Sequence, residues 1–516
     1  MDELIELISS ININKLKSGG LWRFIFEPDS LMEQLCEAIH DGRVRSDEDA
    51  IALLYPGQKP GAKFINLRER LQERILSVVF LLEFRTPGGT DRQKAYFECN
   101  RKWSASMVLL SKNAKRVSIS LMEDLLKQTL HFEFTELSLS ILSALRLHYG
   151  TIHGNLDRYN LYREMYQQQQ EVWMMENEAE DNYTHLVSYF VNSKSSKTSI
   201  SDKAREYFQS VQQHMERSES FRLHLCGRMI QVMIHSSRND YAATARVCED
   251  AITFFRKKKF ESNLPLQAFY YQLIVCYIQL QEFEKGEAII RQYQSVFEEG
   301  SFNWYKLQEL FYLLATYTRH YEEAFQVCDA VQTRIRSGSN GNLPPQITEM
   351  WKIYEAYSHY LVMIGKIQFP ENYVSKFKLK KFLNDIPTYS RDKQGMNIPI
   401  LIIQTLFAIS EQNYHQSIDR IEAVEKYCGR YLKQNETFRS NCFIKALLQI
   451  PAASFHREAV VRKAQKYIDQ LNTLPLDVAY QTHEIEIIPY EHLWEMALEA
   501  LQNQIVKTSV PLRKVG

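Results

Sequence analysis

Apolar residues recur with the spacing of an α-helix along most of this 516-residue chain. The clearest stripe has positions i, i+3, i+4, i+7, i+8, i+11 and i+12, filled by Leu266, Phe269, Tyr270, Leu273, Ile274, Tyr277 and Ile278. Such a stripe buries one wide face of a helix. The same spacing returns in Leu307, Leu310, Phe311 and Leu314, and in Ile347, Met350, Trp351, Tyr354 and Leu361.

Signals for β-structure are few by comparison. The nearest candidate for a strand is the short run 484–488. The 18 glycines and 14 prolines amount to roughly half the average share, too few for the frequent turns of a sandwich or barrel. We therefore predict an all-α fold.

The connections between helices repeat as well. Five times an apolar helix ends at a polar turn, and an aromatic residue then opens a second helix. The turns are Asn239-Asp240-Tyr241, Gln281-Glu282-Phe283, Arg319-His320-Tyr321, Gln412-Asn413-Tyr414 and Ala453-Ser454-Phe455. Their aromatic residues lie 42, 38, 93 and 41 residues apart, and the longest gap holds a further candidate helix pair, 347–364 and 373–383. Self-similarity of this length predicts stacked helical hairpins.

These turns resemble those of tetratricopeptide-repeat (TPR) proteins, in which a small residue follows the aromatic residue three positions later. Four turns carry it, as Thr244, Gly286, Ala324 and Ser417, whereas the fifth has Glu458 there. The resemblance covers roughly residues 203–475, and the period exceeds the family's ~34 residues. It implies a helical-hairpin solenoid, in which the aromatic residue wedges between the two helices of a hairpin and the small residue lets them approach closely.

Shorter helices upstream predict a small N-terminal domain. Asp29 or Ser30 is expected to cap a helix that ends at Gly42, and Ser46 with Asp49 has the spacing of a capping box. A longer amphipathic helix follows at 64–82. We predict five segments: an N-terminal helical domain at 1–90, connecting helices at 91–191, a polar linker at 192–202, TPR-like repeats at 203–503 and a flexible tail at 504–516.

Charge and cysteine usage indicate the compartment and the class of partner. Sixty-two basic residues balance sixty-two acidic ones, which does not favour a protein that coats nucleic acid or anionic lipid. The eight cysteines form no C-x-x-C pair, which suits a reducing cytosol. The N-terminus starts Met1-Asp2-Glu3, without the basic start of a signal peptide, and no apolar run approaches the ~20 residues of a membrane span. We expect a cytoplasmic protein without a membrane segment.

Motifs for catalysis or cofactor binding are missing from the sequence. There is no phosphate-binding G-x-x-x-x-G-K-[ST] loop, no H-E-x-x-H and no G-x-S-x-G. His148 and His153 are five residues apart and would diverge on a helix, so we interpret them as turn residues rather than metal ligands. His483 and Glu484 are interpreted as a solvated helix start or loop. We predict no enzyme, cofactor or metal, although dispersed side chains, for instance within 91–190, could still converge.

Two basic clusters are candidates for contact with phosphate or acidic partners. Arg256, Lys257, Lys258 and Lys259 end a predicted helix, where cations complement the helix dipole. Lys376, Lys378, Lys380 and Lys381 alternate with Phe377, Leu379 and Phe382. We favour a structural role for both clusters, with acidic or nucleic-acid contact as the alternative.

The chain has 29 tyrosines, and this side chain can face a groove and still hydrogen-bond. Helix packing is the expected role for most of them, including the stripe of Tyr159, Tyr162 and Tyr166. As partner-binding positions we select Tyr270, Trp304, Tyr312 and Tyr354.

The favoured function is a non-enzymatic scaffold or adaptor that holds a protein or peptide on the concave face of the repeats. The alternative is a TPR-type regulator whose N-terminal domain contacts nucleic acid, while the repeats sense a peptide or protein signal. The helix at 64–82 offers Arg68, Arg70 and Arg74 for that purpose, but it mixes them with acidic residues. Partner identity and oligomeric state stay open.

Overall fold

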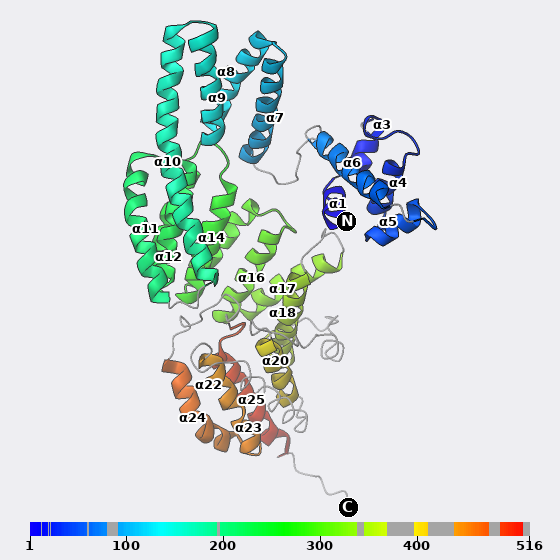
Figure 1. Cartoon of the computed structure of the whole chain (residues 1–516). Helices are drawn as coiled ribbons and strands as arrows, with labels where there is room; N and C mark the ends of the chain where they lie inside the picture. Colours follow the sequence, from blue (N-terminus) through cyan, green and yellow to red (C-terminus); the bar gives the residue numbers. More distant parts are fainter. Residues whose placement is uncertain are drawn as a thin grey trace, which may run out of the picture. The chain divides into compact units, whose positions relative to one another are not determined.

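The computed structural model describes residues 1–516 except 12, 19, 21, 59–60, 80–90, 193–196, 338–344, 369–396, 411–437, 474–485 and 509–516. Every regular element in the described residues is helical (Figure 1), which confirms the all-α prediction. The described part of the strand candidate, 486–488, forms bends. The chain divides into two compact units, Met1–Leu137 and Ser138–Gly516.

The first unit begins with six short helices around one core. They are α1 (Asp2–Ser9), α2 (Ile13–Ser18), α3 (Trp22–Ile25), α4 (Leu31–His40), α5 (Asp47–Leu54) and α6 (Ala62–Val79). Leu4, Leu35 and Leu71 are among the side chains buried between them. Ser30 caps α4 by accepting a hydrogen bond from the backbone N–H of Glu33, and Ser46 with Asp49 forms the predicted capping box of α5.

Two further helices of the first unit, α7 (Asp91–Ser111) and α8 (Lys115–His131), pack against each other. Asn113 lies between them with a left-handed φ of 64°, and the N–H of Ala114 donates to the carbonyl of Leu109 at 2.9 Å. This is the hydrogen bond of a Schellman turn, which ends a helix sharply. The segment expected to be connecting helices thus contains a helical hairpin of its own.

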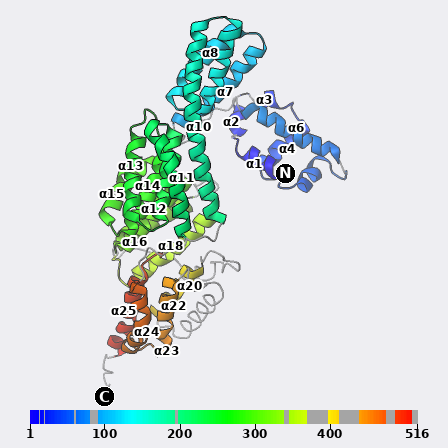
Figure 2. The ribbon, with the colours of Figure 1, turned by 60° about the vertical axis from the view of Figure 1, so that its left-hand side comes forward.

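The second unit starts within α9 (Thr135–Leu147) and continues with η1 (His148–Ile152), α10 (Leu156–Asn192) and α11 (Lys197–Arg217). The hairpins predicted from the turns follow as α12 (Phe221–Ser236) with α13 (Tyr241–Arg256), α14 (Asn263–Gln279) with α15 (Phe283–Tyr293) and η2 (Gln294–Val296), and α16 (Phe302–Tyr317) with α17 (Tyr321–Arg336). Next come α18 (Pro345–Met363), α20 (Asn397–Ser410), α22 (Phe438–Leu447), α23 (Gln449–Ala452), α24 (Arg457–Thr473) and α25 (Tyr490–Thr508). From α10 to α18 each helix packs against the next along the chain (Figure 1, Figure 2).

Three of the five predicted turns share one geometry. Asn239, Gln281 and Arg319 have left-handed φ values of 57°, 58° and 64°. The residue after each of them donates its N–H to the carbonyl five positions back, at 2.8 to 3.0 Å. The aromatic residue is then the first residue of the second helix, as predicted.

The fifth turn differs from this geometry, and the fourth, 412–414, lies outside the described residues. In the fifth turn both Ser454 and Phe455 have left-handed φ values, 52° and 60°. Two such residues in succession lengthen the turn, so α24 begins only at Arg457 and Phe455 does not open it.

One of the small residues that follow the turns, Gly286, packs between successive hairpins. Thr244 and Ala324 are buried, and a Cβ added to Gly286 would lie 2.7 Å from Cδ2 of Leu314 on α16. We expected this residue to bring the two helices of one hairpin together. The nearest contact of Gly286 instead belongs to the first helix of the next hairpin. Phe283 also reaches that hairpin, because its ring stacks on His320 with the centroids 3.7 Å apart.

The last helix returns to helices far back in the sequence. Thr316 on α16 donates to the carbonyl of Ile487 at 2.6 Å, and Arg319 forms an ion pair with Glu495 on α25 at 2.9 Å. One core contains buried residues from Tyr305 to Leu501. The C-terminal part is therefore joined by contacts across more than 170 residues of chain.

A buried ion-pair network holds the start of α25. The guanidinium of Arg439 donates to both Glu486 oxygens, with the shortest contact 2.6 Å, and also to Glu491 at 2.8 Å. Burial lowers the pKa of Arg439, but the hydrogen bonds to Glu486 and Glu491 outweigh it and raise that pKa overall. Arg439 stays charged, and its charge compensates the buried carboxylate of Glu486.

The structure differs from the prediction at several segment boundaries. The first unit extends past residue 90, and the connecting segment 91–191 is shared between both units. α11 begins at Lys197, so residues 197–202 are helical instead of linker; Ile200 is buried there, and the buried Ser201 donates from its hydroxyl to the carbonyl of Ile234 at 2.8 Å. Similarly, α25 continues to Thr508, so 504–508 are helical rather than part of a tail.

Gly286→Leu is expected to destabilise the protein by about 1–3 kcal/mol, because the added side chain overpacks against the buried Leu314. Ala288→Leu is the matched control, since Ala288 is exposed on the same helix. Chemical denaturation followed by circular dichroism measures the difference. Equal stability of the two variants would contradict the close contact between hairpins.

Arg439→Met is expected to cost about 3–5 kcal/mol, because it leaves Glu486 buried without a counter-charge. Adding Glu486→Gln should recover much of the loss, since the amide still accepts from the N–H of Tyr490 but carries no charge. Chemical denaturation of both variants and the wild type tests this. A double variant as unstable as the single one would show that the charge is not the cause.

Candidate functional site

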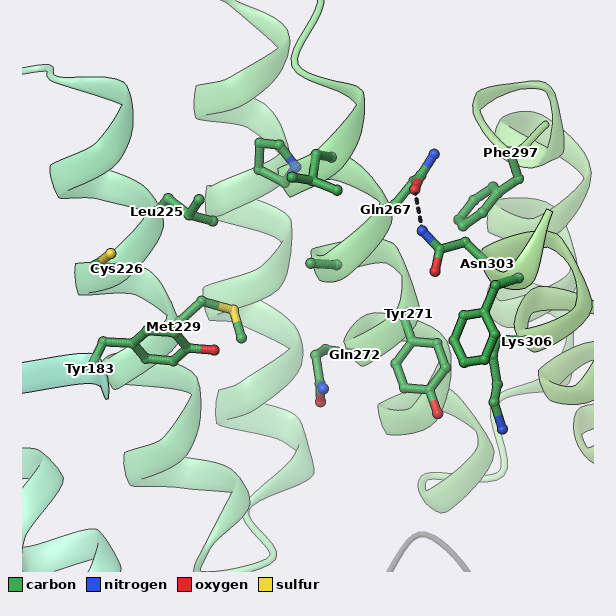
Figure 3. Close-up of a pocket in the computed structure, with 14 residues that line it drawn as sticks. Tyr183, Leu225, Cys226, Met229, Gln267, Tyr271, Gln272, Phe297, Asn303 and Lys306 are labelled. Carbon is green, nitrogen blue, oxygen red and sulfur yellow. Dashed lines mark hydrogen bonds between the residues drawn. The ribbon is translucent and has the colours of Figure 1, made fainter. Parts of the chain in front are cut away.

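A pocket of about 550 Å³ lies along one face of the helical hairpins (Figure 3). Its lining comes from α10, from the first helices of three successive hairpins, α12, α14 and α16, and from Phe297 in the loop before α16. Pockets that hold ligands commonly have volumes of about 300–1,000 Å³. The size therefore suits a short segment rather than a folded domain.

Most of the lining is apolar. It includes Tyr183 from α10, Leu225 and Met229 from α12, Ala268 and Tyr271 from α14, and Phe302 from α16. Leu264, which also lines the pocket, is 59% exposed and Phe302 is 52% exposed. Large apolar side chains exposed beside an apolar pocket are typical of a binding surface.

Side-chain amides form a polar edge on the pocket. Gln267 on α14 donates from Nε2 to the carbonyl of Val296 at 2.8 Å. Its Oε1 accepts from Nδ2 of Asn303 on α16, also at 2.8 Å (Figure 3). Gln272 lies five residues further along α14 and also lines the pocket.

The pocket is nearly free of charge. The 17 residues of α14 include no Asp, Glu, Lys or Arg. The lining has one ionised side chain, Lys306, and its Nζ lies 2.8 Å from Glu309 on the same helix. Glu309 also accepts from the hydroxyl of Tyr354 at 3.1 Å. The positive charge of Lys306 is thus already compensated within the protein.

Three of the four tyrosine and tryptophan positions selected from the sequence were the wrong choice. Tyr270, Tyr312 and Tyr354 are at most 2% exposed, so they belong to the core and cannot face a partner. Tyr270 stacks on Tyr293 with the centroids 4.3 Å apart, and Tyr312 bonds to Ser358 at 3.0 Å. Trp304 is half-buried beneath Arg334 and does not line the pocket.

The residues that do line the pocket on α14 were not among the positions selected from the sequence. Gln267, Ala268, Tyr271 and Gln272 lie beside the apolar stripe that we assigned to the core. Tyr271 is only one position from the selected Tyr270, but one position turns a side chain by about 100° around the helix. The signal that could have found them is a helix without charge in a chain that is 24% charged.

The basic cluster after α13 makes contacts within the protein. Arg256 donates to the hydroxyl of Tyr293 at 2.6 Å and stacks over that ring. Lys258 donates to the carbonyl of Glu219 at 2.5 Å, whereas Lys257 and Lys259 are exposed. These contacts favour the structural role for Arg256 and Lys258. The second cluster, Lys376, Lys378, Lys380 and Lys381, lies outside the described residues.

The histidines and tyrosines near residue 150 pack against each other. The rings of His148 and His153 are 6.1 Å apart, and Tyr149 stacks on Tyr162. Tyr166 lies beneath the guanidinium of Arg146 at 4.4 Å. In the part of the chain that the structure describes, no group of three or more His, Cys, Asp or Glu side chains could hold a metal ion.

The N-terminal helices provide little support for contact with nucleic acid. Arg68 on α6 forms an ion pair with Asp47 at 3.1 Å, whereas Arg70 and Arg74 are exposed. Residues 1–79 contain ten Lys or Arg against thirteen Asp or Glu. A net negative charge opposes association with phosphates.

Comparisons with models of known protein families, with curated proteins and with solved structures find no match. Among the described helices, none is both long and apolar enough to cross a membrane.

A buried histidine lies on α12, the helix that contributes Leu225 and Met229 to the pocket. His224 stacks on Phe254 with the centroids 4.0 Å apart, and its Nε2 lies 3.0 Å from the carbonyl of Ser218. Burial and the charge of Arg228 lower the pKa of His224 to about 4. An unfolded histidine titrates near 6.5, so between these values the unfolded state binds a proton that the folded state does not.

The titration of His224 is therefore expected to lower the free energy of unfolding by about 3 kcal/mol as the pH drops from 6.5 to 4. This contribution is fully present above pH 6.5. His224→Gln should flatten that part of the pH profile, and His40→Gln, at an exposed position, should not. Urea denaturation across the pH range measures it, and an unchanged slope in His224→Gln would contradict the buried neutral ring.

Proposed function

We propose that this protein is a non-enzymatic scaffold or adaptor, in which a TPR-like array of helical hairpins binds a peptide segment of a partner protein. The observation that carries the proposal is the pocket shared by α10, α12, α14 and α16. It combines an apolar lining, a polar edge of amides and exposed apolar side chains in one place.

The array itself is supported by the repetition of its parts. Three hairpin turns share the left-handed residue, the Schellman hydrogen bond and the aromatic residue that opens the second helix. Successive hairpins contact each other through Gly286 and Leu314 and through Phe283 and His320. In an array of this kind the first helices line one common face, which provides a surface longer than any single helix pair.

A peptide is the ligand that this lining suits best. Apolar side chains of a peptide can occupy the spaces beside Leu225, Met229 and Tyr271, whereas its backbone requires hydrogen-bonding groups such as amides. Phe302 and Leu264 are exposed without a ligand, and binding would remove them from water.

The ionisation of the lining supports a binding role over catalysis. Burial, helped by the charge of Glu180, raises the pKa of the Cys226 thiol to about 12. Burial and the nearby Glu309 also raise the pKa of Tyr271 to about 12. Both groups stay protonated near neutral pH, whereas a general base or a thiolate nucleophile functions with a pKa near the working pH.

The test is selection from a displayed library of random peptides against the full chain, followed by affinity measurement with a labelled selected peptide. Ala268→Trp fills the pocket and is expected to weaken binding at least tenfold. Ala288→Trp, on the exposed face of α15, is the control and should bind as the wild type does. A library that yields no specific peptide, or peptides that bind Ala268→Trp equally well, would contradict the proposal.

A further inference from the structure

We infer that the pocket binds an extended, uncharged and apolar segment of the partner, and that Oδ1 of Asn303 accepts a backbone N–H from it. This inference rests on the proposed function, since it specifies the ligand of the same pocket. It is argued from the direction of two hydrogen bonds and from the charge of the lining.

The donor and the acceptor of each hydrogen bond can be assigned from one backbone carbonyl, that of Val296. The oxygen of Val296 can only accept, so the group of Gln267 that lies 2.8 Å from it must be the amide nitrogen. The carbonyl oxygen of the Gln267 side chain is consequently directed at Asn303. Because an oxygen there can only accept, Asn303 must present its Nδ2, and this contact is also 2.8 Å long.

The orientation of the Asn303 amide follows from these two contacts. With Nδ2 held by Gln267, its Oδ1 is directed toward the interior of the pocket (Figure 3). Asn303 is exposed, and within the described residues no protein group donates to this oxygen. A ligand that displaces water from this oxygen must therefore supply a hydrogen-bond donor in its place. Both ends of the Gln267 amide are hydrogen-bonded within the protein, so Gln267 acts as a positioning residue for Asn303.

The charge of the lining determines which hydrogen-bond donor of a ligand suits this pocket. A lysine or arginine of the ligand would need a counter-charge, but Glu309 is already paired with Lys306 and bonded to Tyr354. An acidic side chain would find only Lys306, whose charge is compensated at 2.8 Å. Burying an unpaired charge beside Leu225, Met229 and Ala268 is costly. A backbone N–H is the donor that every extended peptide offers without a charge.

Neighbouring groups fit the same type of ligand. Phe302 precedes Asn303 and is half exposed, so it can cover an apolar side chain next to the bonded N–H. Gln272 and the hydroxyl of Tyr271 also line the pocket. A peptide in a helix would use its interior N–H groups internally, whereas an extended one presents them to Asn303.

The experiment is an N-methyl scan of a peptide selected from the random library, measured by fluorescence anisotropy with the full chain. Methylation of one backbone nitrogen at a time removes one donor. One position is expected to lose about 5- to 10-fold in affinity on the wild type. Asn303→Leu should weaken the unmethylated peptide by a similar factor, and on this variant methylation at that position should cost little more.

Asn160→Leu, at an exposed position of α10 outside the pocket, is the matched control and should leave the scan unchanged. Gln267→Leu frees the amide of Asn303 to rotate, so it should reduce the cost of methylation at the same position while Asn303 is still present. The selected peptides are expected to be apolar, without a required charge.

The outcomes separate this inference from the proposed function. Peptides whose binding is blocked by Ala268→Trp, but whose N-methyl scan has no position that depends on Asn303, would overturn the inference and leave the peptide-binding role in place. A conserved lysine, arginine, aspartate or glutamate that is essential in the selected peptides would overturn the uncharged ligand. If the selection yields no peptide, or if Ala268→Trp does not weaken binding, the proposed function itself is contradicted.

Discussion

The close contact between one helical hairpin and the next is the interaction on which the second unit depends. A single pair of helices cannot hide the wide apolar stripes that α14 and α16 carry, because each stripe faces more than one neighbour. The sharp turns at Gln281 and Arg319 bring the second helix back immediately, and Gly286 leaves room for Leu314 of the following hairpin. The first helices then lie next to each other, as α14 and α16 do. The pocket forms because α14 and α16 direct the faces that are not packed in the core to the same side.

The helical fold and the turn geometry could be predicted from the sequence because both depend on local spacing. A period of 3.6 residues and a polar turn before Tyr241, Phe283 or Tyr321 are visible within about 20 residues of chain. The turn at Asn113 was missed since no aromatic residue follows it directly. The return of α25 could not be predicted, because the contact of Arg319 with Glu495 joins residues 176 apart and leaves no periodic pattern.

The candidate site shows the limit of pattern-based prediction more sharply. The stripe on α14 predicts which face is buried, and a tyrosine within it was selected for its ability to hydrogen-bond. Tyr270 is buried in the core, whereas Tyr271, the next residue along the helix, points in another direction and lines the pocket. The direction of the Asn303 amide depends on the carbonyl of Val296, which lies in η2, so only the three-dimensional structure contains it. The sequence signal for this face was the absence of charged residues along α14. It is informative only by comparison with the rest of the chain, where basic and acidic residues are frequent and balanced.

Photo-cross-linking with mass spectrometry tests the central claim most directly. A selected peptide that carries a diazirine side chain is irradiated on the full chain, and the modified residues are mapped. The account predicts adducts within 225–229, 264–272 and 297–306, which contribute to the pocket from separate helices and the loop before α16. Adducts confined to the N-terminal helices, or to the basic end of α13, would contradict it.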